Sequence, residues 1–251
     1  LDFDNINSIA SKNGLLSGIE IRSPVEISYK FNETSTVVNA SNVIGVIEGT
    51  DKKDEYVFLT AHYDHLGKQE GVVYNGADDD GSGTVTVLQI ASAFAKAKQE
   101  GKGPRRTIVF MTVSGEEKGL WGSNYFSKNP TIDLSTVNCM MNMDMVGRLN
   151  AERALSISGT GTSPNFEKWL TANNNSKFKL LFDKSGIGPS DHSSFYNQNL
   201  PVLHFFTGQH SDYHKPSDDF DKINYDGLND VVNYMYAMCV EMNKNSKLEF
   251  T

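Results

Sequence analysis

The chain has 251 residues, of which 38% are apolar and 22% charged, and its formal net charge is −8. This composition is typical of a globular protein that is long enough for one large α/β domain, and it excludes a disordered chain. The acidic balance argues against a nucleic-acid partner, which needs a basic face, and no apolar run is long enough to span a membrane.

Residues 1–38 are polar and show weak hydrophobic periodicity. We interpret them as an N-terminal extension, or as the edge of a removed neighbouring domain, and expect the folded domain at residues 39–251. The chain starts at Leu1 without a signal peptide, so we expect any targeting segment to lie outside this sequence. The two cysteines, Cys139 and Cys239, lie in apolar segments, which predicts small buried residues rather than a disulfide framework.

Short apolar runs of strand length alternate with longer amphipathic segments along this domain. Runs rich in Val, Ile, Phe or Met predict buried strands at residues 42–47, 56–61, 107–113, 137–143 and 200–206. Apolar residues recur at helical spacing in residues 83–98 and 225–243, which predicts helices there. The alternation predicts an α/β fold with helices on both faces of a largely parallel sheet.

Residues that can bind metals follow the predicted strands, at the carboxyl ends where open α/β sheets gather their ligand sites. His62 and Asp64 come directly after the second run, and Asp64 offers an acceptor for the second ring nitrogen of a ligating histidine. The alternative is an ordinary polar strand end. Asp144 ends the fourth run, where a buried carboxylate is costly unless it is paired or is a ligand.

Three adjacent aspartates, Asp78, Asp79 and Asp80, precede the helix at residues 83–98. Their charges repel one another unless a cation lies among them, and a carboxylate with two oxygens can bridge two metal ions. The alternative is an acidic cap at a helix start. A helix cap accounts for one aspartate at this position, but it does not account well for three in a row.

Paired glutamates, Glu116 and Glu117, follow the third strand, where one could ligate a metal and the other could take a proton from water. A solvated helix start is the alternative. In the loop before the last helix, His214 is a possible ligand with Asp218 as a possible acceptor, and the Tyr213 phenol could donate to a developing oxyanion. An ordinary polar loop is the alternative here.

Together these positions offer two histidines and three carboxylates, each after a strand. If there were no metal site, the ordinary structural explanations would have to hold independently at all five positions. Nitrogen and oxygen ligands without cysteine favour a catalytic zinc pair over a structural zinc.

The chain resembles the family of co-catalytic di-zinc aminopeptidases, which includes secreted bacterial leucyl aminopeptidases, glutamate carboxypeptidase and the glutaminyl cyclases. The resemblance covers roughly residues 40–243 and rests on five motifs in order, His62-x-Asp64, Asp78-Asp79-x-Gly81-Ser82-Gly83, Glu116-Glu117-x-Gly119, Asn142-Met143-Asp144 and Tyr213-His214-x-x-x-Asp218. It implies a zinc exopeptidase-like, three-layer α/β/α fold with a central mixed sheet, and a zinc peptidase catalytic domain at residues 39–251.

The resemblance also implies two zinc ions per chain. Asp79 would bridge them, His62 and Asp144 would complete one site, and Glu117 and His214 would complete the other. Asp78 and Asp80 would support the site without ligating.

The same resemblance implies catalytic roles for three further residues. Glu116 would be the general base that acts on a metal-bridged water and later returns the proton to the leaving amine. Asp64 would orient His62, and Tyr213 would polarise the scissile carbonyl. Ser190-Asp191-His192 matches a further family motif near the pocket, and His65 would line that pocket.

We therefore predict a hydrolase: a zinc-dependent metallo-aminopeptidase that removes N-terminal residues from peptide substrates. The alternatives on the same fold are a glutaminyl-peptide cyclase, which would hold one zinc, and a carboxypeptidase. A binding module without activity is the alternative from another class, although such relatives usually lose ligands. Family habit predicts an extracytoplasmic location, whether secreted, periplasmic or lipid-anchored. The sequence does not define the oligomeric state or the side-chain specificity.

Overall fold

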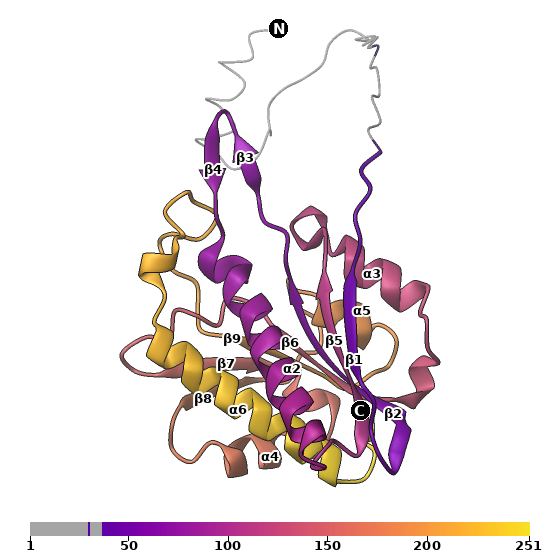
Figure 1. Ribbon diagram of the computed structural model, residues 1–251. Coiled ribbons are helices and arrows are strands. Elements are labelled where there is room, and N and C mark those ends of the chain that lie inside the picture. Colours follow the sequence, from indigo (N-terminus) through magenta and orange to yellow (C-terminus); the bar gives the residue numbers. More distant parts are fainter. Residues whose placement is uncertain (1–29, 31–36) are drawn as a thin grey trace, which may run out of the picture. The chain divides into compact units, whose positions relative to one another are not determined.

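A twisted sheet forms the centre of the computed structural model, which describes Lys30 and residues 37–251 (Figure 1). Within these residues the sheet has seven strands, in the spatial order β1 (Val43–Ile47), β5 (Arg106–Val113), β2 (Lys52–His62), β6 (Val137–Met143), β9 (Val202–Phe206), β7 (Ala154–Ser158) and β8 (Lys179–Asp183). The neighbours from β5 to β9 run parallel, as do β7 and β8, whereas β1 on β5 and β7 on β9 are antiparallel. The prediction of a mixed, largely parallel sheet is confirmed.

Helices cover both faces of this sheet. The side chains of α2 (Gly83–Gln99), α4 (Phe166–Asn173) and α6 (Tyr225–Lys244) pack with one face in the larger hydrophobic core, and α2 and α6 lie in front of the sheet in Figure 1. The shorter helices α3 (Trp121–Lys128) and α5 (His192–Tyr196) pack on the other face in a second core. The three-layer α/β/α prediction is confirmed.

The alternation of side chains along β2 explains why both faces are apolar. Val57, Leu59 and Ala61 belong to the larger core, whereas Phe58 belongs to the second core. A strand buried on both faces has no polar side, and this is why the sequence shows it as a continuous apolar run.

The five predicted strands and two predicted helices all form, with ends that differ from the expected ends by a few residues. The sequence did not predict β7, β8, α3, α4 and α5, nor the small hairpin of β3 (Gly67–Gln69) and β4 (Val72–Tyr74). Single helical turns lie at Glu116–Lys118, Leu134–Thr136, Thr160–Thr162 and Phe220–Lys222.

Residues Asn39–Thr251 form one compact unit. The predicted N-terminal extension falls almost entirely outside the described residues and stays a prediction. Cys139 and Cys239 are buried and unpaired with each other, as the sequence predicts. Over the described part of the chain, no helix combines the length and the apolar character that a bilayer crossing requires.

The parallel strands fix the position of the site. The strands β2, β5, β6 and β9 all point the same way, so the segments that leave their carboxyl ends meet at one edge of the sheet. These segments follow His62, Val113, Met143 and Phe206, the last residues of the four strands.

Candidate metal centre

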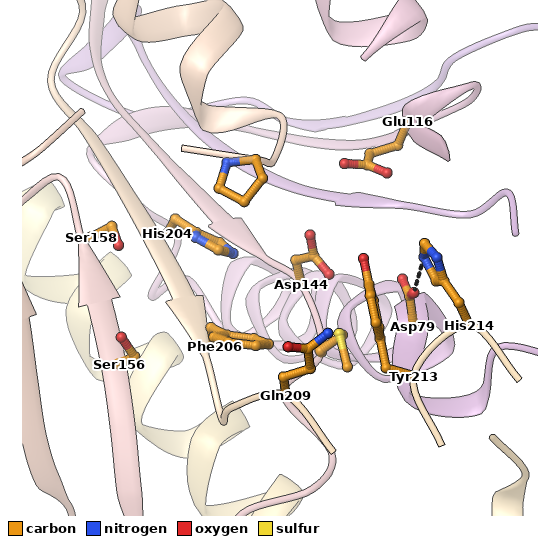
Figure 2. A pocket seen from close by; sticks show the side chains of 12 residues that line it. Asp79, Glu116, Asp144, Ser156, Ser158, His204, Phe206, Gln209, Tyr213 and His214 are labelled. Atoms are coloured by element: carbon orange, nitrogen blue, oxygen red, sulfur yellow. Dashed lines mark ion pairs between the residues drawn. The ribbon is translucent and has the colours of Figure 1, made fainter. Parts of the chain in front are cut away.

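Asp79 lies at the centre of a cluster of acids and histidines at this edge. Its Oδ1 is 3.2 Å from Nε2 of His62, and its Oδ2 is 3.2 Å from Nε2 of His214. The two histidines come from the end of β2 and from the loop before α6, far apart in the sequence. Each oxygen of one carboxylate therefore faces a different histidine, and Figure 2 shows the contact between Asp79 and His214.

On the His62 side, the cluster contains Asp144, whose Oδ1 is 3.7 Å from Nε2 of His62. The other oxygen of Asp144 accepts a hydrogen bond of 2.7 Å from Oγ of Ser190, and Ser190 in turn accepts from the Asn142 amide at 2.8 Å. Nδ1 of His62 lies 2.9 Å from the carbonyl oxygen of Asp64. Asp144 and His62 are thus each oriented by a neighbouring group on the side that faces away from the other.

On the His214 side, the cluster contains Glu117, whose Oε2 is 3.1 Å from Nε2 of His214. The other oxygen, Oε1, is 2.7 Å from Nδ1 of His65. The sequence suggested only that His65 lines the pocket. The structure instead places it against Glu117, and His65 is not among the residues that line the pocket of the cluster.

We call the five residues His62, Asp79, Glu117, Asp144 and His214 the acidic cluster. All five were predicted as metal ligands, and the structure brings them together. The neighbouring aspartates, Asp78 and Asp80, make hydrogen bonds mainly with backbone groups. Asp80 accepts backbone hydrogen bonds from His62, Gly83 and Met145, and Asp78 accepts one from Gly147 and lies 3.1 Å from Nε2 of His210. Asp78 and Asp80 thereby fix the turn that presents Asp79.

The carboxylate of Asp64 binds backbone more closely than it binds His62. It accepts hydrogen bonds from the backbone N–H of Glu116 and of Glu117, at 3.1 and 3.4 Å, while its Oδ1 is 3.9 Å from Nδ1 of His62. Gly115, in the left-handed region with φ 76°, allows the sharp turn that starts this segment. Asp64 therefore positions the glutamate pair as well as the histidine.

Glu116 lines the pocket next to the acidic cluster (Figure 2). Burial raises the pKa of Glu116 to about 8, and the neighbouring charge of Asp144 adds to this rise. A bound cation would act in the opposite direction and favour the charged carboxylate.

The ring of Tyr213 stacks on that of His214, with centroids 3.8 Å apart, and its hydroxyl points into the pocket (Figure 2). Burial raises the pKa of Tyr213 to about 12, so the phenol keeps its proton. Asp218 differs from expectation. It is fully buried and accepts hydrogen bonds from the backbone N–H of Asp78 and Asp79, so it holds the aspartate turn and not His214.

The donor set of the acidic cluster fits metal ions. Two buried carboxylate oxygens, Oδ2 of Asp79 and Oε1 of Glu117, make no hydrogen bond of good geometry among the described residues, although they face nitrogens of His214 and His65 at 3.2 and 2.7 Å. Burial opposes a charge on His62, yet Asp144 and Asp79 raise its pKa above the usual value. The same negative field would hold cations, and imidazole with carboxylate is a ligand set that zinc accepts.

A pocket of about 320 Å³ extends from this cluster along the sheet. Asp79, Glu116, Asp144, Tyr213 and His214 line one end, and Ser156, Ser158, His204 and Phe206 line the other (Figure 2). We call the latter four residues the floor. The sequence did not predict them, because β7 is a five-residue strand with two serines and shows no strong apolar run.

A family model described as Peptidase family M28 matches residues 42–239, most of the chain and every residue of the acidic cluster. The chain belongs to peptidase family M28. The predicted family is therefore confirmed, and the site described above is that of an M28 chain.

Two curated proteins illustrate the similarity. The M28 chain is 32% identical over 120 residues to a probable zinc metalloprotease of Leptosphaeria maculans, a match that covers 46% of this chain and 26% of the relative. It is 31% identical over 199 residues to a probable leucine aminopeptidase of Trichophyton verrucosum, which covers 69% of this chain and 52% of the relative.

A solved structure, that of the zinc aminopeptidase BSAP from Bacillus subtilis, superposes with a TM-score of 0.68 at 25% identity, and the match covers 82% of the M28 chain and 50% of BSAP. The M28 chain spans about half the length of this structure and of the leucine aminopeptidase, and about a quarter of the zinc metalloprotease.

Proposed function

We propose that this M28 chain is a zinc-dependent aminopeptidase that holds two zinc ions. The observation that carries the proposal is the position of Asp79, whose two oxygens each face a different histidine at 3.2 Å. A single carboxylate with this arrangement can serve two metal ions at once. The zinc aminopeptidase BSAP and the leucine aminopeptidase relative support zinc as the metal and the amino end as the place of cleavage.

The acidic cluster divides into two ligand sets that share Asp79. His62 and Asp144 would hold one ion, and Glu117 and His214 would hold the other. Ser190 behind Asp144 and His65 behind Glu117 would keep these carboxylates in place, since outer partners of ligands orient them. Bound zinc ions supply a lowered water pKa and a polarised substrate carbonyl.

Glu116 would move the proton. It lines the pocket without joining either ligand set, and Asp64 holds its backbone. In this position its carboxylate would take a proton from the attacking water and donate it to the leaving amine, and the amide bond would break. Tyr213 keeps its proton at neutral pH and would donate a hydrogen bond to the oxyanion of the substrate.

The experiment is a zinc count by elemental analysis on the purified chain, paired with hydrolysis of aminoacyl-p-nitroanilides and of peptides blocked at either end. We expect two zinc ions per chain and release of N-terminal residues. We also expect a chelator to abolish the release and added zinc to restore it. N-terminal acetylation should block the reaction and C-terminal amidation should not.

Other outcomes would overturn the proposal in defined ways. One zinc ion with loss of ammonia from N-terminal glutamine, and no amide hydrolysis, would indicate a glutaminyl cyclase. Cleavage that needs a free C-terminus would indicate a carboxypeptidase. No bound metal after incubation with zinc would leave a binding module.

A further inference from the structure

The floor of the pocket is a patch of four side chains on two neighbouring strands. In the antiparallel pair of β7 and β9, Ser156 lies opposite Phe206 and Ser158 lies opposite His204. Leu155 and Ile157 point into the larger core, so Ser156 and Ser158, at the alternate positions of β7, point to the opposite face of the sheet. Two hydroxyls and an imidazole therefore line the bottom of a pocket whose other end is the acidic cluster.

His204 is the most buried polar group of this floor. Its side chain is 8% exposed, and its Nε2 has no hydrogen-bond partner among the described residues. The ring is held in place, because it stacks on His192 at 4.6 Å between centroids and lies 6.1 Å from the ring of Phe206. Burial lowers the pKa of His204, so the ring is neutral at neutral pH and can donate through one nitrogen and accept through the other.

The walls around the floor carry no charge. They consist of Met145 and Pro189, with Gln209 exposed at the rim. Arg148, three residues after Met145, contacts Asp212 at 3.1 Å and does not line the pocket. A charged substrate side chain in this pocket would have no countercharge at the floor, and burying an unpaired charge is costly. An apolar side chain would bury the hydroxyls and the imidazole without partners, which is also unfavourable.

We propose that the floor binds the side chain of the substrate's N-terminal residue and selects a neutral polar one, a carboxamide or a hydroxyl. This inference rests on the proposed aminopeptidase function and names the substrates of that site. The pocket adjoins Glu116 and Asp144, so a side chain next to the reacting carbonyl enters it. Glutamine is the best probe, because its amide offers a donor and an acceptor to His204 and the serines.

The test compares tripeptides Xaa-Ala-Ala in which Xaa is glutamine, methionine or glutamate, by kcat/KM on the zinc-loaded chain. Methionine resembles glutamine in length without its amide, and glutamate has its shape with a charge. We expect glutamine to exceed each of the others by about tenfold, since a site built for hydrogen bonds rejects analogues that lack them or carry charge. Mass spectrometry identifies the product as free glutamine and separates cleavage from cyclisation.

Two variants identify the floor as the cause. We expect the double variant Ser156→Ala/Ser158→Ala to lose the preference for glutamine over methionine, while its zinc content stays at the wild-type value. His204→Phe keeps a flat ring and should shift the preference in the same direction. The matched control is Ser92→Ala on the exposed side of α2, which should keep the wild-type ratio.

The outcomes separate this inference from the proposed function. Cleavage of all three peptides with methionine preferred would overturn the inference and leave the aminopeptidase standing. Wild-type preference for glutamine that survives in both floor variants would also overturn it. If no peptide is cleaved by the zinc-loaded chain, the proposed function itself fails.

Discussion

The two ends of the pocket are built in opposite ways. In the acidic cluster, Asp144 is held by Ser190 and Glu117 contacts both His65 and His214. At the floor, by contrast, the Nε2 of His204 has no protein partner among the described residues, and Ser156 and Ser158 face the pocket. In the acidic cluster the side chains hold one another in place, whereas at the floor the polar side chains face the pocket and can contact a substrate.

We interpret this difference as a division between catalysis, at the acidic cluster, and substrate selection, at the floor. Chemistry requires metal ligands and a base in one geometry for every substrate, so they need neighbours that orient them. Selectivity requires groups that only the right substrate satisfies. We therefore expect changes in and behind the acidic cluster to lower the rate for all substrates, and changes at the floor to alter the ratio between substrates.

The largest expected effect comes from Glu116→Gln. The amide cannot take a proton, so we expect kcat to fall by about 10²- to 10⁴-fold for every substrate while two zinc ions stay bound. Single-turnover rates and elemental analysis of the same sample measure both quantities. Glu100→Gln, at the exposed residue directly after α2, is the control and should be unchanged. A Glu116→Gln protein with wild-type turnover would remove Glu116 from the base role.

A smaller effect should follow from Ser190→Ala, which removes the hydrogen bond to Oδ2 of Asp144. We expect the affinity of the zinc site that contains Asp144 to fall by roughly 10- to 100-fold, because outer partners of metal ligands contribute about that much. Competition with a fluorescent chelator measures it. Ser127→Ala is the matched control, since Ser127 is a buried serine whose hydroxyl donates to the carbonyl oxygen of Asn124 in the same helix. Equal zinc affinities in the two variants would contradict the role of Ser190.

The smallest effect is expected at the rim of the pocket, for Gln209→Ala. Gln209 is exposed and belongs to neither the acidic cluster nor the floor. Surface substitutions usually change the free energy of unfolding by less than about 0.5 kcal/mol. We expect thermal unfolding, zinc content and the ratio of glutamine to methionine cleavage to stay at wild-type values. If this variant lost the preference for glutamine, Gln209 at the rim, and not the floor, would be the group that selects the substrate.

Sequence reasoning predicted the cluster end of the pocket and missed the floor, for a physical reason. His62, Glu117 and Asp144 lie at or shortly after the ends of the buried strands β2, β5 and β6, and the apolar runs of these strands mark their places in the sequence. The floor depends on register: Ser158 meets His204 only because β7 pairs with β9 antiparallel, and nothing local in the sequence specifies that pairing.

Two smaller differences have similar causes. Asp218 was expected to act on His214, four residues away, but it binds backbone N–H groups about 140 residues away in the sequence. The contact of His65 with Glu117 likewise joins two loops whose approach only the folded sheet defines. The extracytoplasmic location stays a prediction.

The proposal that Asp79 joins two zinc sites is tested most directly by anomalous diffraction at the zinc absorption edge from crystals of the zinc-loaded chain. We predict two anomalous peaks, one beside each carboxylate oxygen of Asp79, with His62 and Asp144 at one and Glu117 and His214 at the other. A single peak, or two peaks of which only one contacts Asp79, would contradict the claim that this carboxylate joins two metal sites.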